Sequence, residues 1–99
     1  MNYILRGKEI VKEDDILAWG RWFESADRTV KADEINGYRI STVFIGLDHR
    51  CFGEGPPIVF ETMIFGLLDD DEYQDRYCTW EDAEKGHARA IEWLNSKYN

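Results

Sequence analysis

Residues 38–66 constrain the fold most strongly, because two apolar runs there flank a polar loop that contains glycine and proline. The runs 38–45 and 58–65 are short, rich in β-branched and aromatic residues, and bounded by turn-forming residues, which is typical of strands. Strands that follow each other in sequence usually pair. We therefore predict that these two runs form adjacent antiparallel strands at the centre of a sheet.

Turn residues next to this stretch extend the predicted sheet. The dipeptide Asn36-Gly37 favours a type I′ turn, which joins the two strands of a hairpin. We therefore predict a strand over 28–35 that returns as 38–45. A weaker strand is expected over 73–78, after an acidic turn.

In the N-terminal quarter of the chain, the sequence predicts a β-hairpin followed by a helix. Residues 2–12 are expected to form two strands that turn at Gly7-Lys8, because glycine suits the first position of a type II′ turn. Asp14 or Asp15 would then cap a helix that ends near Ala26, since a short carboxylate accepts hydrogen bonds from the free backbone N–H groups of a first turn. The apolar stripe of this helix consists of Ile16, Trp19, Gly20 and Phe23.

The C-terminal segment carries the clearest helical pattern. Thr79 and Asp82 have the spacing of a capping box, and apolar residues then recur three and four positions apart. Strands and helices do not alternate regularly along the chain, which disfavours a parallel doubly wound sheet. We therefore predict a single α+β domain over residues 1–99, with an antiparallel β-sheet and two α-helices packed on one face.

Composition indicates a folded chain with one core. The chain has 99 residues, of which 43% are hydrophobic, and this is enough for a core without disulfides or metals. No apolar run approaches the roughly 20 residues that span a bilayer, and the N-terminus lacks the apolar centre of a signal peptide. We therefore expect a cytoplasmic protein, with no membrane partner, in which Cys51 and Cys78 are free thiols.

The charge balance disfavours direct binding of nucleic acid. Twenty acidic and twelve basic residues give a net charge of −8, whereas binding to phosphate backbones needs clustered lysine and arginine. The same charge permits an acidic surface to occupy a basic groove on another protein. The densest acidic block lies within residues 69–75, where a solvated turn is the alternative interpretation. The candidate partner-binding residues in this block are Asp69, Asp70, Asp71 and Glu72.

Three polar residues mark a candidate site where the first apolar run opens into the central loop. Asp48, His49 and Arg50 follow one another there, and loops held by a rigid sheet often carry binding groups. His49 could act as a general base and Arg50 could hold an anion. Adjacent residues of an extended chain point apart, however, so catalysis would need a third group from elsewhere. Ligand or partner binding is therefore favoured over catalysis, and a purely structural loop remains an alternative.

Glu61 is the second candidate, because it interrupts an apolar strand. Alternation places it on the same side as Val59, Met63 and Phe65. A buried carboxylate needs a partner, and Arg39 on the neighbouring strand could supply it. Glu61 and Arg39 are therefore interpreted as a structural ion pair or as ligand-binding groups.

His87 lies within the apolar stripe of the last helix, which indicates a half-buried, hydrogen-bonded core histidine. Metal ligation by His49 and His87 with Asp48 or Glu61 is the weaker alternative, since ligand spacings such as HxxxH or CxxC are absent from the sequence. We predict no metal and no other cofactor.

Two segments of the chain resemble a family of small proteins of tailed phages and prophages. The matching phrases are STVF-G-LDH, PP--FETM-FG and RY-TWE-A--GH, and they cover roughly residues 38–87. Cys51 resembles an insertion into this pattern, and Leu67-Leu68 replace an expected glycine-containing turn. The resemblance implies a viral origin but assigns no activity and no catalytic residue.

These observations predict a small phage accessory protein that binds a ligand or a partner and has no catalytic activity. It would counter host defence by sequestering a small, nucleotide-type signalling ligand, in a pocket formed by residues 46–57 and Glu61. The alternative is an acidic inhibitor that docks through residues 69–75 on the nucleic-acid-binding groove of a host defence protein, and a hydrolase using His49 and an acid is the least favoured class. Fourteen aromatic residues, with Trp22 and Trp93 off the main stripes, also favour a homo-oligomer.

Overall fold

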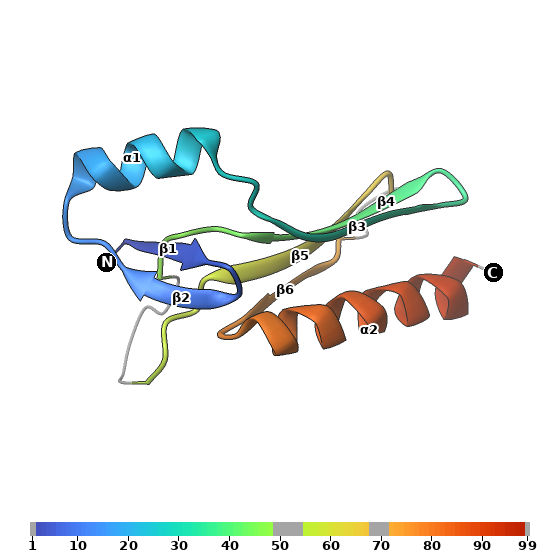
Figure 1. Cartoon of the computed structure of the whole chain (residues 1–99). Coiled ribbons are helices and arrows are strands. Elements are labelled where there is room, and N and C mark those ends of the chain that lie inside the picture. Colours follow the sequence, from blue (N-terminus) through green and yellow to red (C-terminus); the bar gives the residue numbers. More distant parts are fainter. Residues whose placement is uncertain (1, 49–54, 68–71, 99) are drawn as a thin grey trace.

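Eight elements follow one another in the computed structural model, which describes residues 2–48, 55–67 and 72–98 (Figure 1). They are β1 (Tyr3–Arg6), β2 (Glu9–Lys12), α1 (Ile16–Ser25), β3 (Thr29–Ile35), β4 (Tyr38–Phe44), β5 (Phe60–Phe65), β6 (Gln74–Tyr77) and α2 (Trp80–Tyr98). The predicted α+β class with an antiparallel sheet is confirmed. Neither helix in these ranges is long and apolar enough to cross a membrane.

The main sheet has four antiparallel strands in the order β3-β4-β5-β6. β4 and β5 therefore lie at the centre, with Phe44 opposite Phe60, which confirms the pairing predicted from the two apolar runs. Asn36 and Gly37 have φ angles of 53° and 86°, as the predicted type I′ turn between β3 and β4 requires. β1 and β2 pair separately as a hairpin.

Helix α2 covers one face of the main sheet (Figure 1). Ile40 and Ile64 pack there against Leu94. The helix lies very close to the sheet at Gly86, where an added Cβ atom would lie 2.1 Å from the Tyr77 ring. A side chain at this position would therefore force the two layers apart.

The central strands separate two faces by alternation. Every second residue is buried beneath α2, namely Ile40, Thr42, Phe44, Phe60, Thr62 and Ile64. The residues between them are half-buried or exposed on the opposite side, and we call this side the open face. Its central members are Arg39, Ser41, Val43, Glu61, Met63 and Phe65.

Helix α1 packs beside the hairpin and lies away from α2 (Figure 1). Its N-cap is Asp15, one of the two predicted residues. The Trp19 indole N–H donates to the carbonyl oxygen of Tyr3 in β1, at 2.9 Å. Trp22 reaches the core of the main sheet, where its ring meets the Phe44 ring edge-on with centroids 5.7 Å apart. α2 is therefore the helix that covers the sheet, and α1 reaches it through one tryptophan.

Candidate ligand-binding site

The structure describes part of the predicted site. Arg39 and Glu61 lie on the open face, and Asp48 lies at the start of the central loop. Glu72 is described and exposed. Outside the described residues lie His49, Arg50, Asp69, Asp70 and Asp71.

Glu61 is held by β6 and not by β4. Its carboxylate accepts a hydrogen bond from the Gln74 side-chain amide and lies 3.5 Å from the Arg76 guanidinium, with 13% of its side chain exposed. The predicted ion pair with Arg39 does not form, because the register sets Arg39 opposite Phe65, four residues farther along β5. The Glu61 carboxylate thus forms a small polar cluster with Gln74 and Arg76 at one side of the open face.

Arg39 contacts an aromatic ring instead. Its guanidinium carbon lies 5.4 Å from the centroid of the Phe65 ring, which is within the range of a cation–π interaction. Phe65 is 45% exposed, so its ring is accessible to solvent. The open face therefore presents an accessible ring with a positive charge beside it.

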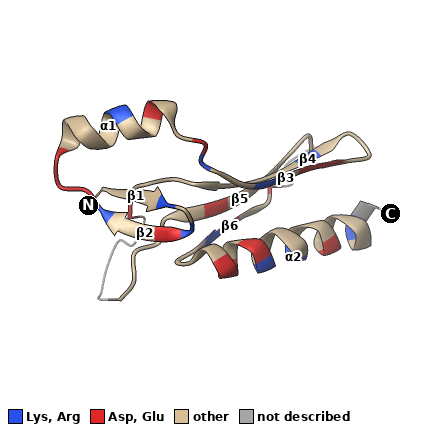
Figure 2. Cartoon of the chain, in the orientation of Figure 1, with Lys and Arg blue, Asp and Glu red and all other residues tan. Residues whose placement is uncertain are grey.

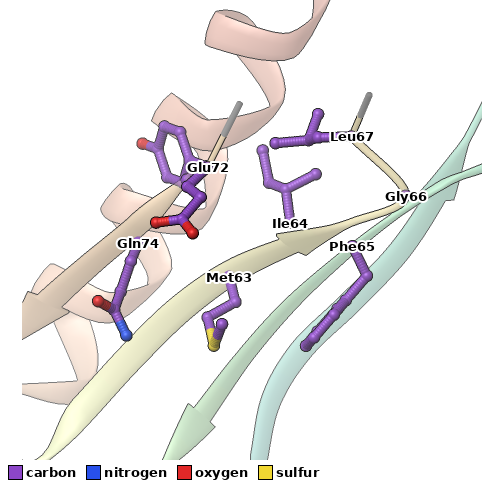
Figure 3. A pocket seen from close by; sticks show the side chains of 8 residues that line it. Met63, Ile64, Phe65, Gly66, Leu67, Glu72 and Gln74 are labelled. Atoms are coloured by element: carbon purple, nitrogen blue, oxygen red, sulfur yellow. The ribbon is translucent and has the colours of Figure 1, made fainter. Parts of the chain in front are cut away.

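A hollow of about 330 Å³ lies next to this ring, where β5 ends and β6 approaches. In Figure 3, Met63, Phe65 and Gln74 point to one side of the sheet, and Ile64 and Leu67 point to the other. Its lining residues are Met63, Ile64, Phe65, Gly66, Leu67, Glu72, Tyr73 and Gln74. The volume suits a small organic ligand, since such pockets measure about 300–1,000 Å³.

Sequence reasoning did not single out Met63, Phe65 and Gln74 as site residues. The alternation of β5 places Met63 and Phe65 on the side of Glu61, and this signal was available. It was weak because an apolar residue in a strand is usually a core residue. Gln74 gave no signal of its own, because only the pairing of β5 with β6 brings it opposite Met63.

Asp48 closes the base of the central loop. Its Oδ1 atom accepts a hydrogen bond from the backbone N–H of Ile58 at 2.9 Å, ten residues along the chain. This contact joins the two ends of the loop. A structural role for Asp48 is therefore established, and the predicted roles of its two neighbours remain predictions.

A chain of hydrogen bonds crosses the core from β3 to β6. Asp33 Oδ2 lies 2.7 Å from His87 Nε2, and His87 Nδ1 lies 2.7 Å from Thr42 Oγ1. Thr42 Oγ1 lies 2.6 Å from Thr62 Oγ1, which accepts from the Tyr77 hydroxyl at 3.0 Å. His87 is 1% exposed, so it is a hydrogen-bonded core residue as interpreted, and more deeply buried than expected.

A single direction of hydrogen-bond donation satisfies every group in this series of hydrogen bonds. The Tyr77 hydroxyl donates to Thr62, Thr62 donates to Thr42, and Thr42 donates to His87 Nδ1, which leaves the Nε2 proton for Asp33. The order Asp33, His87, Thr42 is that of an acid–base–nucleophile triad. Thr42 is 0% exposed, however, so a substrate cannot reach its hydroxyl oxygen. The chain of hydrogen bonds therefore joins structural elements and does not form an active site.

Two tyrosines at the β6 end of the core have altered acidity. Burial raises the pKa of Tyr77 to about 12, and the negative charge of Asp75 adds to this effect. Burial, reinforced by the negative charge of Asp75, also raises the pKa of Tyr73. The Tyr77 hydroxyl therefore keeps its proton at neutral pH and remains a donor to Thr62.

The structure describes only part of the cysteines and candidate metal ligands. Cys78 is a free thiol within the described ranges, 3.7 Å from the carbonyl oxygen of Pro56, and Cys51 lies outside them. The described residues contain no group of three or more His, Cys, Asp or Glu side chains placed to hold a metal ion. Among the described residues, the hollow beside Phe65 is the candidate site.

The resemblance of the chain to phage proteins rests on the three sequence phrases alone and stays a prediction. No protein-family model matches the chain, and no curated protein or solved structure is significantly similar to it.

Proposed function

We propose that the protein is a non-enzymatic binding protein that holds a small, nucleotide-type ligand on its open face. One observation carries the proposal, namely that an exposed ring and hydrogen-bonding side chains border one hollow, and that the Arg39 guanidinium lies beside this ring. In a phage-infected cell, such a protein would act by sequestering a signalling ligand of host defence. The resemblance to phage proteins supports this setting.

Phe65 and Met63 would provide the apolar contact. A base that stacks on an exposed aromatic side chain gains about 1–3 kcal/mol. Phe65 is exposed enough to accept such a stack, and Met63 lies in the same hollow with a flexible side chain that adapts to the shape of a ligand. A planar ring is therefore the chemical group that this part of the open face fits best.

Polar groups on either side of Phe65 would recognise the rest of the ligand. The Arg39 guanidinium beside the ring has the planar fork of donors that suits a phosphate. On the other side, Glu61 accepts from the side-chain nitrogen of Gln74, which leaves the Gln74 oxygen available to a donor on a base. Glu72 adds a carboxylate at the rim of the hollow. A mononucleotide would use these groups without the extended basic surface that nucleic acid requires.

The proposal is tested by measuring binding to nucleotides and to extract fractions. We expect a low-molecular-weight fraction from phage-infected cells, or a member of a nucleotide panel, to raise the melting temperature of the protein. Phe65→Ala and Arg39→Gln should each weaken the affinity about tenfold, which corresponds to about 1.4 kcal/mol. Leu17→Ala is the matched control, because Leu17 on α1 is 68% exposed and lies outside the hollow.

Two results would contradict the proposal. The first is a melting temperature that stays constant in every low-molecular-weight fraction and with every nucleotide. The second is equal affinity for the wild type, Phe65→Ala and Arg39→Gln when a ligand does bind. The first result would mean that the protein binds no small ligand of these kinds. The second would mean that the ligand binds away from the open face.

The net charge of −8 favours a second candidate function, an acidic inhibitor of a host defence protein. Acidic and basic residues are interspersed along α2, so this helix does not present a purely acidic surface (Figure 2). The acidic segment 69–72 would then carry the interaction. In this case only the macromolecular fraction should stabilise the protein, and added salt should weaken the association. Replacing its four acids by amides should slow association, whereas a ligand on the open face should still bind.

A further inference from the structure

The two edge strands of the main sheet differ in whether their outward-pointing backbone N–H groups already have hydrogen-bond partners. On β6, which has four residues, the N–H of Arg76 is taken up by the side chain of Asp75 at 2.9 Å. The other Asp75 oxygen lies 3.9 Å from Arg89 of α2. The outward N–H groups of β6 belong to Gln74 and Arg76, and an edge on which one of two such donors is already bonded is a poorer template for another strand. β6 is therefore a partly protected edge.

The outer edge formed by β3 is longer and less protected. The two-residue turn sets Ile35 opposite Tyr38, and in an antiparallel ladder alternate residues exchange both backbone hydrogen bonds with the neighbour. Ile35 and Asp33 therefore bond to β4, and the backbone groups of Ala32 and Glu34 point away from the sheet. A shift in register affects only the beginning of the strand, between Thr29 and Lys31, so 31–35 stay regular.

We propose that β3 pairs with β3 of a second copy of this chain. The two strands would run antiparallel about a twofold axis at Ala32, which joins the two four-stranded sheets into one. Addition of a strand to an exposed sheet edge is a common mode of recognition. The small Ala32 side chain at the axis fits beside its own copy, which lies directly opposite on the same face.

In this arrangement, charged residues of β3 in one copy lie opposite residues of the opposite charge in the other copy. With Ala32 opposite its own copy, Lys31 lies opposite Asp33 of the second copy, and the symmetry repeats this pair. Lys31 and Asp33 both occupy the face covered by α2, since they are aligned with Thr42 and Ile40 of β4. The Asp33 side chain stays 37% exposed although one oxygen contacts His87, so it can also meet a lysine. Opposite charges in directly facing positions stabilise strand pairs.

The proposed dimer is tested by sedimentation over a series of protein concentrations. We expect the wild type to show a reversible dimer. Ala32→Pro should be monomeric, because proline removes an outward N–H and costs no hydrogen bond to β4. Lys31→Glu should raise the dissociation constant about tenfold, because two attractive pairs become repulsive. Lys85→Glu is the matched control, since it makes the same charge change at an exposed position of α2 and should leave the dimer intact.

Three results would overturn this inference. A wild type that sediments as a monomer at every concentration excludes the dimer. An Ala32→Pro variant that is folded by circular dichroism and still dimeric excludes the β3 edge. If Ala32→Pro does not fold, equal dissociation constants for Lys31→Glu and Lys85→Glu exclude it instead.

Discussion

Five side chains share the buried chain of hydrogen bonds, and each belongs to a different element. Asp33 lies on β3, Thr42 on β4, Thr62 on β5, Tyr77 on β6 and His87 on α2. Burying a polar group without a hydrogen bond costs free energy, and in the described part of the chain every buried side-chain nitrogen and oxygen has a partner. The position of each strand is thus coupled to the helix through directional contacts.

Removal of one hydroxyl should show what this chain of hydrogen bonds contributes. Thr42→Val keeps the shape of the side chain but leaves His87 Nδ1 and the Thr62 hydroxyl without their partner. We expect the free energy of unfolding to fall by about 1–3 kcal/mol, measured by urea denaturation. Thr29→Val, the same change at an exposed position, should stay within about 0.5 kcal/mol of the wild type. Equal stabilities of the two variants would mean that the contacts are energetically neutral.

The raised pKa of Tyr77 predicts a loss of stability in alkaline solution. An unperturbed tyrosine ionises near pH 10, whereas burial raises the pKa of Tyr77 in the folded state to about 12. Below pH 10 the hydroxyl is protonated in both states, so its contribution is fully present. As the pH rises from about 10 to about 12, the unfolded chain releases this proton first and the free energy of unfolding falls. Tyr77→Phe should flatten this part of the stability curve, and an unchanged slope would contradict the assignment.

At the scale of elements, the two helices differ in how much of their surface is buried. α2 buries Ala83, Ala90 and Leu94 against the sheet, whereas α1 has no buried residue. Ile16 opens the predicted apolar stripe of α1 and is nevertheless 61% exposed. Helical spacing predicts that a stripe exists, but how much of it is covered depends on neighbouring elements. α1 begins at the open end of the hairpin, and its first turn therefore has little to pack against.

One substitution made in both helices should have opposite effects. Gly20→Ala in α1 meets no atom within 4 Å, so the gain in helix propensity should raise the free energy of unfolding by up to about 1 kcal/mol. Gly86→Ala in α2 places its Cβ 2.1 Å from the Tyr77 ring, and overpacking should cost about 1–3 kcal/mol. Thermal and chemical unfolding of both variants measures the difference. A stabilised Gly86→Ala variant would show that α2 can move away from β6 at little cost.

At the scale of the whole molecule, the sequence predicts the pairing of strands better than it predicts the candidate site. The antiparallel pairing of β4 and β5 follows from two apolar runs and one loop, because both signals are local. The partner of Glu61 could not be predicted in the same way. It depends on the register between β5 and β6, which brings Arg76 opposite Glu61. Phe65 gave only a weak signal, because the sequence alone does not say which face of the sheet the helix covers.

The interleaving of buried and exposed residues in β4 and β5 has a consequence for how such a protein can evolve. Core positions and surface positions alternate one by one along the same strands. A substitution at Arg39, Val43 or Met63 alters what the surface presents while the packed layer beneath α2 keeps its own residues. Mutational tolerance along these strands should therefore rise and fall with a period of two. A lineage carrying this fold can diversify its specificity in small steps at little risk to folding.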